Sequence, residues 1–323
     1  MLDLISIGDA TLDTFVKIND ASVMCTLEKE VCMLCLNYAD KIPIARLDQK
    51  VAGNACNVAT GGARLGLKTA FYSIVGNDDI GKRVTRAMKS EGVSLKYVEV
   101  DKGRPSNYSV VLNYKSERTI LVYHHPRHYK MPKLEPANWI YYTSIGANHE
   151  SLERSILKYL RTTHPRPHLA FNPGTHQLRK GLSRLRDVLR MTTVLFVNKE
   201  EAEGLVGRAG DMKGLLDRLK ETGPEISVIT DGDKGSFVHN GGEYWYMPIY
   251  PVKVIEKTGA GDSFAIGFVG ALAHGKKLHE ALQWGTANSA SVVTKIGPQP
   301  GLLTVAGIQQ MTRKYKKIKP KKI

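Results

Sequence analysis

A run of small residues that ends in one carboxylate lies between Thr258 and Asp262, and it reads Thr-Gly-Ala-Gly-Asp. Apolar side chains follow at helical spacing, at Phe264, Phe268 and Leu272, so the run predicts a turn that opens a helix. The first amides of a helix lack backbone partners and favour anions, and glycines let a ligand approach them closely. A carboxylate at such a site indicates a base that takes a proton from a hydroxyl attacking a bound phosphate. The alternative is an ordinary loop in which Asp262 caps the helix.

Two further groups of polar residues accompany this run. Asn57 lies in the stretch from Ala52 to Ala59, which reads Ala-Gly-Asn-Ala-Cys-Asn-Val-Ala, and Asn198 and Glu201 follow an apolar segment. In this order and at these separations, the three motifs resemble the signatures of the ribokinase family of sugar and nucleoside kinases, also called the phosphofructokinase-B group. The resemblance covers roughly residues 2 to 305. Three ordered motifs are stronger than one, because a single motif match is only a hypothesis.

The resemblance implies ATP-dependent phosphorylation of a hydroxyl group on a sugar or a related small molecule. Asp262 is then the general base, and the amides of Gly259, Ala260 and Gly261 form the anion hole for the transferring phosphoryl group. A carboxylate at Asp13 suits the acceptor, because it can accept hydrogen bonds from two neighbouring hydroxyls. The resemblance assigns Gly53, Asn54 and Asn57 to the acceptor as well, and Asn198, Thr230, Gly232, Gly235, Thr258 and Asn288 to ATP.

Cations are also implied by the resemblance. It places Mg²⁺ near Asn198 and Glu201, through water, and Mg²⁺ keeps several waters when it binds a protein. The same pair is nearly a capping box, and the two roles are compatible. The sequence departs from the family at Glu256-Lys257, where many members have Asp-Thr and the Asp helps to place a monovalent cation. Glu256 is therefore a candidate for that cation site, with K⁺ as a candidate activator. Gly146 is a second departure, because ribokinase proper has an acidic substrate ligand there, and this counts against ribose.

Strand and helix patterns alternate along most of the chain. Polar candidates follow short apolar runs at Asp13, Asn172, Asn198 and Asp231. The alternation predicts an α/β fold with a mainly parallel sheet covered on both faces, and with the active site at the carboxyl ends of the strands. The resemblance makes this a ribokinase-like three-layer α/β/α sandwich with a small β-sheet lid from about 14–50 and 105–125. We expect lid strands at 30–36, 41–44, 107–114 and 118–123, and a helix over 54–65 that Asn54 caps.

Three cysteines, Cys25, Cys32 and Cys35, are close together in the predicted lid. Their spacing could begin a zinc site, but a structural zinc site needs four ligands, and Cys56 belongs to the acceptor motif. We expect free thiols in strands instead. Four cysteines in 323 residues do not indicate a disulfide framework, so a reducing cytoplasm is expected. A group of His124, His125, Arg127 and His128 could contact a sugar acid or a phosphate, but a solvated loop is the expected reading.

The composition bounds the remaining possibilities. A hydrophobic content of 42% argues against disorder, and the chain has no run of about 18 apolar residues, so no membrane partner is expected. The net charge of +15 is concentrated at the end of the chain, where Arg313 to Lys322 holds seven basic residues and no acidic one. We expect a kinase domain over 1–312 and a solvated basic tail over 313–323, with no specific nucleic-acid partner. A homodimer formed through the lid is one assembly that the resemblance allows.

Three classes of function compete for this sequence. The first is the kinase described above, acting on a sugar or, as the alternative, on an adenosine-like nucleoside. The second is a noncatalytic ligand-binding regulator on the same fold, which the intact motif residues disfavour. The third is a nicotinamide-dependent oxidoreductase, which fails because Gly8-Asp9-Ala10 after the first predicted strand is not a dinucleotide fingerprint.

Overall fold

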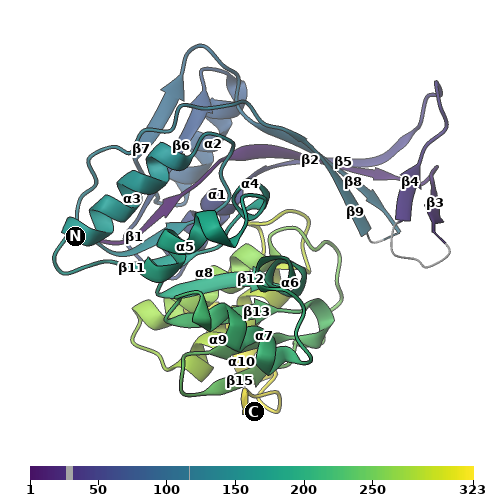
Figure 1. Ribbon diagram of the computed structural model, residues 1–323. Coiled ribbons are helices and arrows are strands. Elements are labelled where there is room, and N and C mark those ends of the chain that lie inside the picture. The colour runs from purple at the N-terminus through teal and green to yellow at the C-terminus, as the bar shows by residue number, and fades with distance from the viewer. Residues whose placement is uncertain (27–31, 116) are drawn as a thin grey trace.

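A computed structural model describes residues 1–26, 32–115 and 117–323 of the chain. A large sheet with helices on both faces forms the body, and a small four-stranded sheet reaches away from it (Figure 1). A separate pair of short strands lies beside the outer end of the small sheet. The predicted three-layer α/β/α architecture with a lid is therefore confirmed.

The large sheet has ten strands in the order β16-β15-β14-β13-β12-β11-β10-β1-β6-β7. Neighbours from β7 to β13 pair in parallel, and β14 to β16 are added antiparallel at one edge. Parallel pairing follows from the helices that connect these strands, since a crossover is needed to return the chain. The strands are β1 (Leu2–Ile7), β6 (Thr69–Gly76), β7 (Ser94–Asp101), β10 (Ala137–Tyr142), β11 (His168–Phe171), β12 (Val194–Asn198), β13 (Ile226–Thr230), β14 (Ser236–His239), β15 (Tyr244–Met247) and β16 (Lys321–Lys322).

Helices cover both faces of this sheet. One face packs against α3, α5, α6 and α7, and the other against α1, α2, α8, α9 and α10. The helices are α1 (Asn54–Arg64), α2 (Asp79–Ser90), α3 (Glu150–Thr162), α4 (Thr175–Leu178), α5 (Leu182–Met191), α6 (Lys199–Val206), α7 (Met212–Glu221), α8 (Ala260–Ala273), α9 (Leu278–Val292) and α10 (Val305–Lys314), with a 3₁₀ turn at Gly232–Lys234. Side chains of a strand alternate between the two faces of the sheet. In β1, Leu4 therefore belongs to the core that includes α8, and Ile5 belongs to the core that includes α3.

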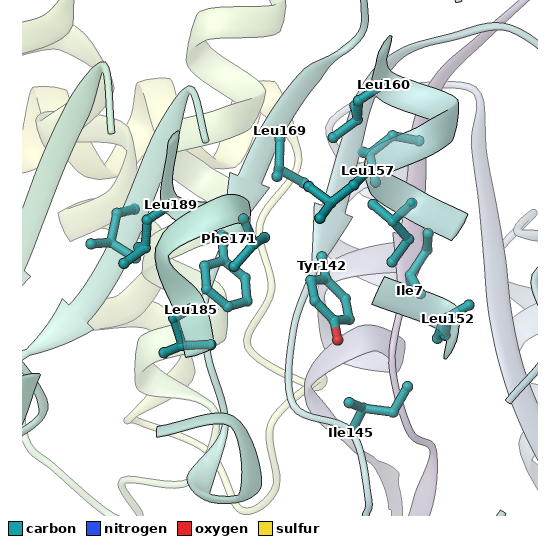
Figure 2. Close-up of a cluster of buried hydrophobic side chains, with 14 of the residues drawn as sticks. Ile7, Tyr142, Ile145, Leu152, Leu157, Leu160, Leu169, Phe171, Leu185 and Leu189 are labelled. Atoms are coloured by element: carbon teal, nitrogen blue, oxygen red, sulfur yellow. The ribbon is translucent and has the colours of Figure 1, made fainter. Parts of the chain in front are cut away.

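The core on the α3 side combines strand and helix side chains, as Figure 2 shows. Tyr142 of β10 and Phe171 of β11 stack with their ring centroids 5.3 Å apart. Leu152 and Leu157 of α3 and Leu185 of α5 complete this part of the core. Burying one large apolar side chain stabilises the fold by about 1.5–3 kcal/mol. This packing holds in place the strands whose ends carry the site residues.

The lid is a sheet of four strands in the order β5-β2-β8-β9. These strands are β2 (Thr11–Ile18), β5 (Ile44–Ala52), β8 (Tyr108–Tyr114) and β9 (Glu117–Tyr123). The predictions at 107–114 and 118–123 are confirmed, but no strand covers 41–43, because β5 begins at Ile44. Of the strand expected at 30–36, β4 (Cys32–Cys35) is present, and residues 30 and 31 lie outside the described residues. β4 pairs with β3 (Ser22–Cys25).

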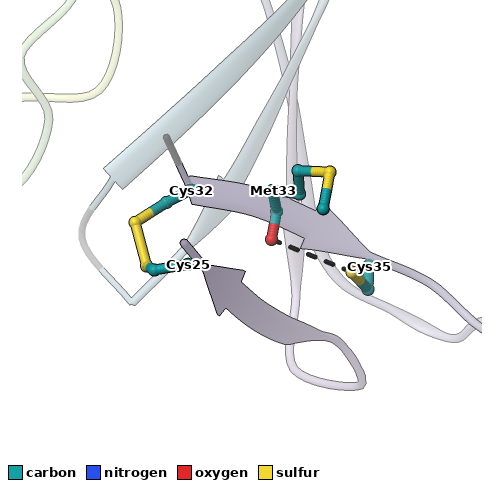
Figure 3. The surroundings of a disulfide bond; sticks show 4 residues. All are labelled: Cys25, Cys32, Met33 and Cys35. Carbon is teal, nitrogen blue, oxygen red and sulfur yellow. Dashed lines mark hydrogen bonds between the residues drawn. A yellow bond between two sulfur atoms is a disulfide. The ribbon is translucent and has the colours of Figure 1, made fainter. Parts of the chain in front are cut away.

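The cysteines of this strand pair differ from the prediction. Cys25 and Cys32 form a disulfide and are not free thiols, whereas Cys35 is free and its thiol donates to the Met33 carbonyl (Figure 3). The register explains the pairing, because Cys25 and Cys32 lie directly opposite each other across β3 and β4. Within the described part of the chain, no group of three His, Cys, Asp or Glu side chains is arranged to bind a metal. The disulfide therefore does not support the expected reducing compartment.

The basic C-terminus contacts the body through Tyr315 and β16, although its basic side chains are exposed. The predicted boundary at 312 falls inside α10, which continues to Lys314. The ring of Tyr315 stacks on Tyr250 at 4.6 Å, and its hydroxyl donates to the Pro251 carbonyl. Lys322 lies in β16 and donates to Glu243 at 2.8 Å. Basic side chains can thus point outward while the backbone completes the edge of the sheet. No helix among the described residues is both long and apolar enough to cross a bilayer.

Candidate active site

The predicted base and the acceptor motif meet where two helices begin. Asn57 lies in the first turn of α1 and donates from Nδ2 to Oδ2 of Asp262, in the first turn of α8, at 2.7 Å. Glycines permit this approach, because a Cβ on Gly61 would lie 2.6 Å from Ile266 of α8 and one on Gly270 would lie 2.5 Å from Leu65. A glycine on each helix, Gly61 on α1 and Gly270 on α8, therefore lets the two helices pack closely. Two motifs separated by 205 residues are joined at one carboxylate.

The turn before α8 leaves main-chain amides open. Gly259 is the N-cap and has a left-handed backbone with φ of 80°, where a Cβ would lie 2.3 Å from Pro298. Among the hydrogen bonds of the described chain, the amides of Gly261 and Asp262 have no main-chain acceptor, whereas that of Ala260 donates to the Lys257 carbonyl at 3.2 Å. A Cβ on Gly261 would meet nothing within 4 Å, so this side of the turn is open. The geometry is that of an anion-binding helix N-terminus.

Asp262 lies in a low-dielectric environment that contains other acids. Its side chain is only 7% exposed, and burial raises its pKa from 3.8 to about 6. The hydrogen bond from Asn57 opposes this pKa shift, and the charges of Asp13 and Glu201 add to it. A carboxyl with a pKa near 6 is ionised at neutral pH but is more basic than an ordinary aspartate.

Asp13 lies within β2 of the lid, and not after a strand of the main sheet as expected. Burial raises its pKa to about 6, the hydroxyls of Ser109 and Thr11 lower it, and the charge of Glu256 raises it. Its Oδ1 is buried and has no hydrogen-bond partner among the described residues. A buried carboxylate oxygen without a partner is costly, so it indicates a ligand hydroxyl at this point.

Asn107, which was not among the predicted site residues, has a similar unpaired group. It is 1% exposed, its Oδ1 accepts from the His125 amide at 3.2 Å, and its Nδ2 has no partner among the described residues. Asn107 directly precedes β8, and its carbonyl accepts from the amide of Leu12, next to Asp13 in β2, at 3.3 Å. A donor and an acceptor that lack partners among the described residues thus lie on adjacent stretches of the lid.

Two loop residues, Glu256 and Gln299, complete this region. Glu256 accepts from the amide and hydroxyl of Thr258 through Oε1, at 2.8 and 2.6 Å, and its buried Oε2 has no partner among the described residues. Gln299 donates to Asn57 Oδ1 at 3.3 Å, which fixes the Asn57 amide with its nitrogen toward Asp262. No sequence signal pointed to Gln299, because its role depends on how its loop packs on α1.

Four of the six residues predicted to contact ATP, Asn198, Thr230, Gly232 and Gly235, lie at or just after the ends of β12 and β13. Asn198 is paired with Thr230 in the sheet register. Asn198 Oδ1 accepts from the Glu201 amide and Glu201 Oε2 accepts from the Asn198 amide, so the predicted capping box is present. Burial raises the pKa of Glu201. The loop that carries Gly232 and Gly235 follows β13, and a Cβ on Gly235 would lie 2.3 Å from the Met247 carbonyl.

Other predicted residues have different surroundings. Asn288 is fully buried, donates to the Ser263 carbonyl at 2.7 Å and accepts from the Leu303 amide at 2.9 Å, so its amide braces α8 against α9 and is not open to adenine. Gly53, and not Asn54, is the N-cap of α1, with φ of 100°. At Gly146 a Cβ would lie 2.7 Å from the Tyr129 hydroxyl, so an acidic side chain does not fit there.

Arg127 was expected in a solvated loop, but it is buried. It pairs with Asp101 at 2.9 Å and also donates to the Pro105 carbonyl. It therefore anchors the segment that leads out of the lid. His124 is half-buried, and burial lowers its pKa.

The chain is similar to known kinases over nearly its whole length. Residues 16–305 match the pfkB family of carbohydrate kinases. An uncharacterized sugar kinase of Archaeoglobus fulgidus is 28% identical over 250 residues, which are 74% of this chain and 97% of that protein.

Two solved structures have the same fold. The nucleoside kinase of Methanocaldococcus jannaschii has a TM-score of 0.75 at 21% identity and covers 97% of this chain and 99% of its own. Arabidopsis thaliana ribokinase, complexed with ribose and ATP, has a TM-score of 0.77 at 20% identity, and the match covers 96% of this chain and 98% of that ribokinase chain. With the family match over residues 16–305, the chain belongs to the pfkB family of carbohydrate kinases, enzymes that transfer a phosphoryl group to an alcohol.

Proposed function

We propose that this kinase transfers the γ-phosphoryl group of ATP to a hydroxyl of a sugar or a related polyol, with Asp262 as general base. The observation that carries the proposal is the Asn57–Asp262 contact of 2.7 Å at a helix N-terminus whose amides at Gly261 and Asp262 are open. A base and an anion site then lie within one helical turn. A hydroxyl held there can lose its proton as the bond to phosphorus forms.

The acceptor is held by the lid in this proposal. Asp13 Oδ1 accepts a hydrogen bond from one acceptor hydroxyl, and Asn107 Nδ2 donates to an oxygen next to it. The Asn57 amide cannot rotate freely, because Gln299 holds its oxygen, and so it keeps one lone pair of Asp262 occupied. The second carboxylate oxygen of Asp262 is the one that takes the proton. Gly53 and Asn54 border the acceptor site at the start of α1.

ATP is assigned to the edge formed by Thr230, Gly232, Gly235 and Asn198, next to Thr258 and the open amides before α8. Mg²⁺ would neutralise charge on the phosphates there. Asn198 and Glu201 each use one oxygen in the capping box, so we assign Mg²⁺ to them through water. K⁺ is assigned to Glu256, because its buried Oε2 has no hydrogen-bond donor among the described residues, as a cation ligand would.

Two further features belong to the proposal. The strand β9 exposes apolar side chains on both faces, including Leu121 and Val122, which supports a homodimer formed through the lid. A cytoplasmic location would give the enzyme access to ATP. An adenosine-like nucleoside is the alternative acceptor. It is included in the assay because the fold is similar to that of the Methanocaldococcus jannaschii nucleoside kinase.

A coupled assay of ADP release tests the proposal over pentoses, hexoses, sugar acids, sugar phosphates and nucleosides. We expect turnover that depends on one of the polyol acceptors and on Mg²⁺. Turnover with nucleosides alone would replace the sugar by the alternative acceptor. ADP release that no acceptor accelerates would contradict the proposed transfer to a hydroxyl.

A further inference from the structure

A cavity of about 510 Å³ lies between the lid and the turn at Ile255–Lys257. Its wall contains five cationic side chains and only two carboxylates, those of Asp48 and Glu256. The cations are Lys17, Arg46, Lys115, Arg118 and Lys257. The proposed function uses none of them.

Three of these cations and Asn113 form a row with one residue on each of the four strands of the lid. Lys17 of β2 is paired with Arg46 of β5 on one side and with Asn113 of β8 on the other. Asn113 is in turn paired with Arg118 of β9. Residues paired in register point to the same face and lie about 5 Å apart. The row therefore presents two neighbouring cations, an amide and a third cation to one cavity.

Such a row is unfavourable without an anion. Like charges directly opposite each other destabilise a sheet, and Lys17 faces Arg46. Arg46 is partly neutralised by Asp48 at 2.6 Å, and Lys257 donates to Glu117 at 2.6 Å. Lys17 and Arg118 have no acidic partner among the described residues. Lys17 is also an exposed residue in a strand that is otherwise buried. Two uncommitted cations and an amide together match a phosphate, which offers several acceptor oxygens.

The row continues the proposed acceptor site. Asp13, Phe15 and Lys17 alternate along β2 and so share one face, and the cavity wall includes Phe15 and Lys17. Four residues of a strand span about 13 Å between Cα atoms, and a lysine side chain reaches back over part of that length. An acceptor hydroxyl at Asp13 and a phosphate at Lys17 are thus separated by about the length of a sugar.

We propose that the lid row of Lys17, Asn113 and Arg118, with Arg46, binds a phosphate group already carried by the acceptor, so that the substrate is a phosphorylated sugar. This inference rests on the proposed function for the reacting end of the acceptor. A neutral sugar or nucleoside would leave the row without an anion. Lys257 approaches the same cavity from the turn before the anion hole and adds positive charge where a second phosphate group arrives.

Matched pairs of acceptors test the inference. The ADP-release assay compares D-fructose with fructose 1-phosphate and fructose 6-phosphate, and D-ribose with ribose 5-phosphate. We expect at least one phosphorylated sugar to exceed its neutral partner by about tenfold or more in kcat/KM. Lys17→Met keeps most of the side-chain volume and loses the charge, and it should lower the ratio of phosphorylated to neutral kcat/KM by about 10–100-fold. Lys89→Met, on the exposed side of α2, is the matched control and should leave the ratio unchanged.

Calorimetric titration of the same sugars into wild type and Lys17→Met separates the two proposals. Turnover of neutral sugars with no gain from the phosphate would overturn the inference and leave the kinase proposal standing. If no acceptor turns over, tighter binding of a sugar phosphate than of its neutral partner, lost in Lys17→Met, would still support the phosphate site. Equal binding of both sugars, or binding that Lys17→Met does not weaken, would refute it.

Discussion

Replacing Asp262 by Asn should make the enzyme slower and its fold more stable. Burial raises the pKa of this carboxyl from 3.8 to about 6, so the folded protein holds the charged form less easily than the unfolded chain does. The raised pKa therefore makes the free energy of unfolding depend on pH. The contribution from the neutral carboxyl is fully present below pH 3.8 and is lost as the pH rises through about 6. At about 1.4 kcal/mol per pKa unit, the ionised carboxylate costs at most about 3 kcal/mol at pH 8.

Asp262→Asn removes that cost and keeps the geometry. Its amide oxygen can still accept the hydrogen bond from Asn57. We expect the free energy of unfolding at pH 8 to rise by about 1–3 kcal/mol, because the cost of about 3 kcal/mol for the ionised carboxylate is an upper bound. The gain should vanish below pH 4, where the wild-type carboxyl is protonated as well. Loss of the base should lower kcat by about 10²–10⁴-fold while the KM values of both substrates stay within a few-fold.

Urea unfolding at pH 8 and pH 4, together with steady-state kinetics, measures both effects on the same preparations. Asp79→Asn is the matched control, since Asp79 lies in the first turn of α2 with an exposed side chain. That variant should change neither kcat nor stability by much, as is usual for exposed substitutions. Near-normal turnover in folded Asp262→Asn would refute the assignment of the base. Lower stability at pH 8 would refute the electrostatic argument.

Three further outcomes are expected. Asp13→Ala should raise the KM of the acceptor strongly and leave the KM of ATP near wild type in initial-rate kinetics; equal loss for ATP would move Asp13 out of the acceptor site. Glu256→Gln should abolish any dependence of the rate on K⁺, because it removes the charge of the unpaired Oε2, and a K⁺ response that persists in the variant would contradict the cation assignment. Truncation after Thr312 should lower the melting temperature, because it deletes Tyr315 and β16, while kcat at 20 °C stays near wild type; an unchanged melting temperature would show that the terminus contributes no stability.

The sequence was most informative where local chemistry decides the structure. The small residues before Asp262 require a turn, and the apolar spacing after it requires a helix, so α8 and its open N-terminus could be predicted together. The same holds for α1 and for the capping box at Asn198. The family resemblance placed Asn57 and Asp262 at one site, but their hydrogen bond was not predicted, since periodicity says nothing about contacts between distant helices.

Features that depend on tertiary approach were missed. Asn107 and Gln299 gain their roles from the neighbours that fix one end of each amide, and neither lies in a motif. Asn288 matched a family position, but its burial between α8 and α9 gives it a bracing role. The lid row was invisible in the sequence, because Lys17, Arg46 and Arg118 become neighbours only through strand register.

Phosphorus-31 NMR of the complete reaction tests the central claim most directly. The claim is that a hydroxyl deprotonated by Asp262 receives the phosphoryl group. With the best acceptor from the screen, we predict a new phosphate-ester resonance that grows in equal amount to ADP, and almost none with Asp262→Asn at the same protein concentration. ADP accompanied by inorganic phosphate alone, or an ester that forms equally fast with Asp262→Asn, would contradict the account.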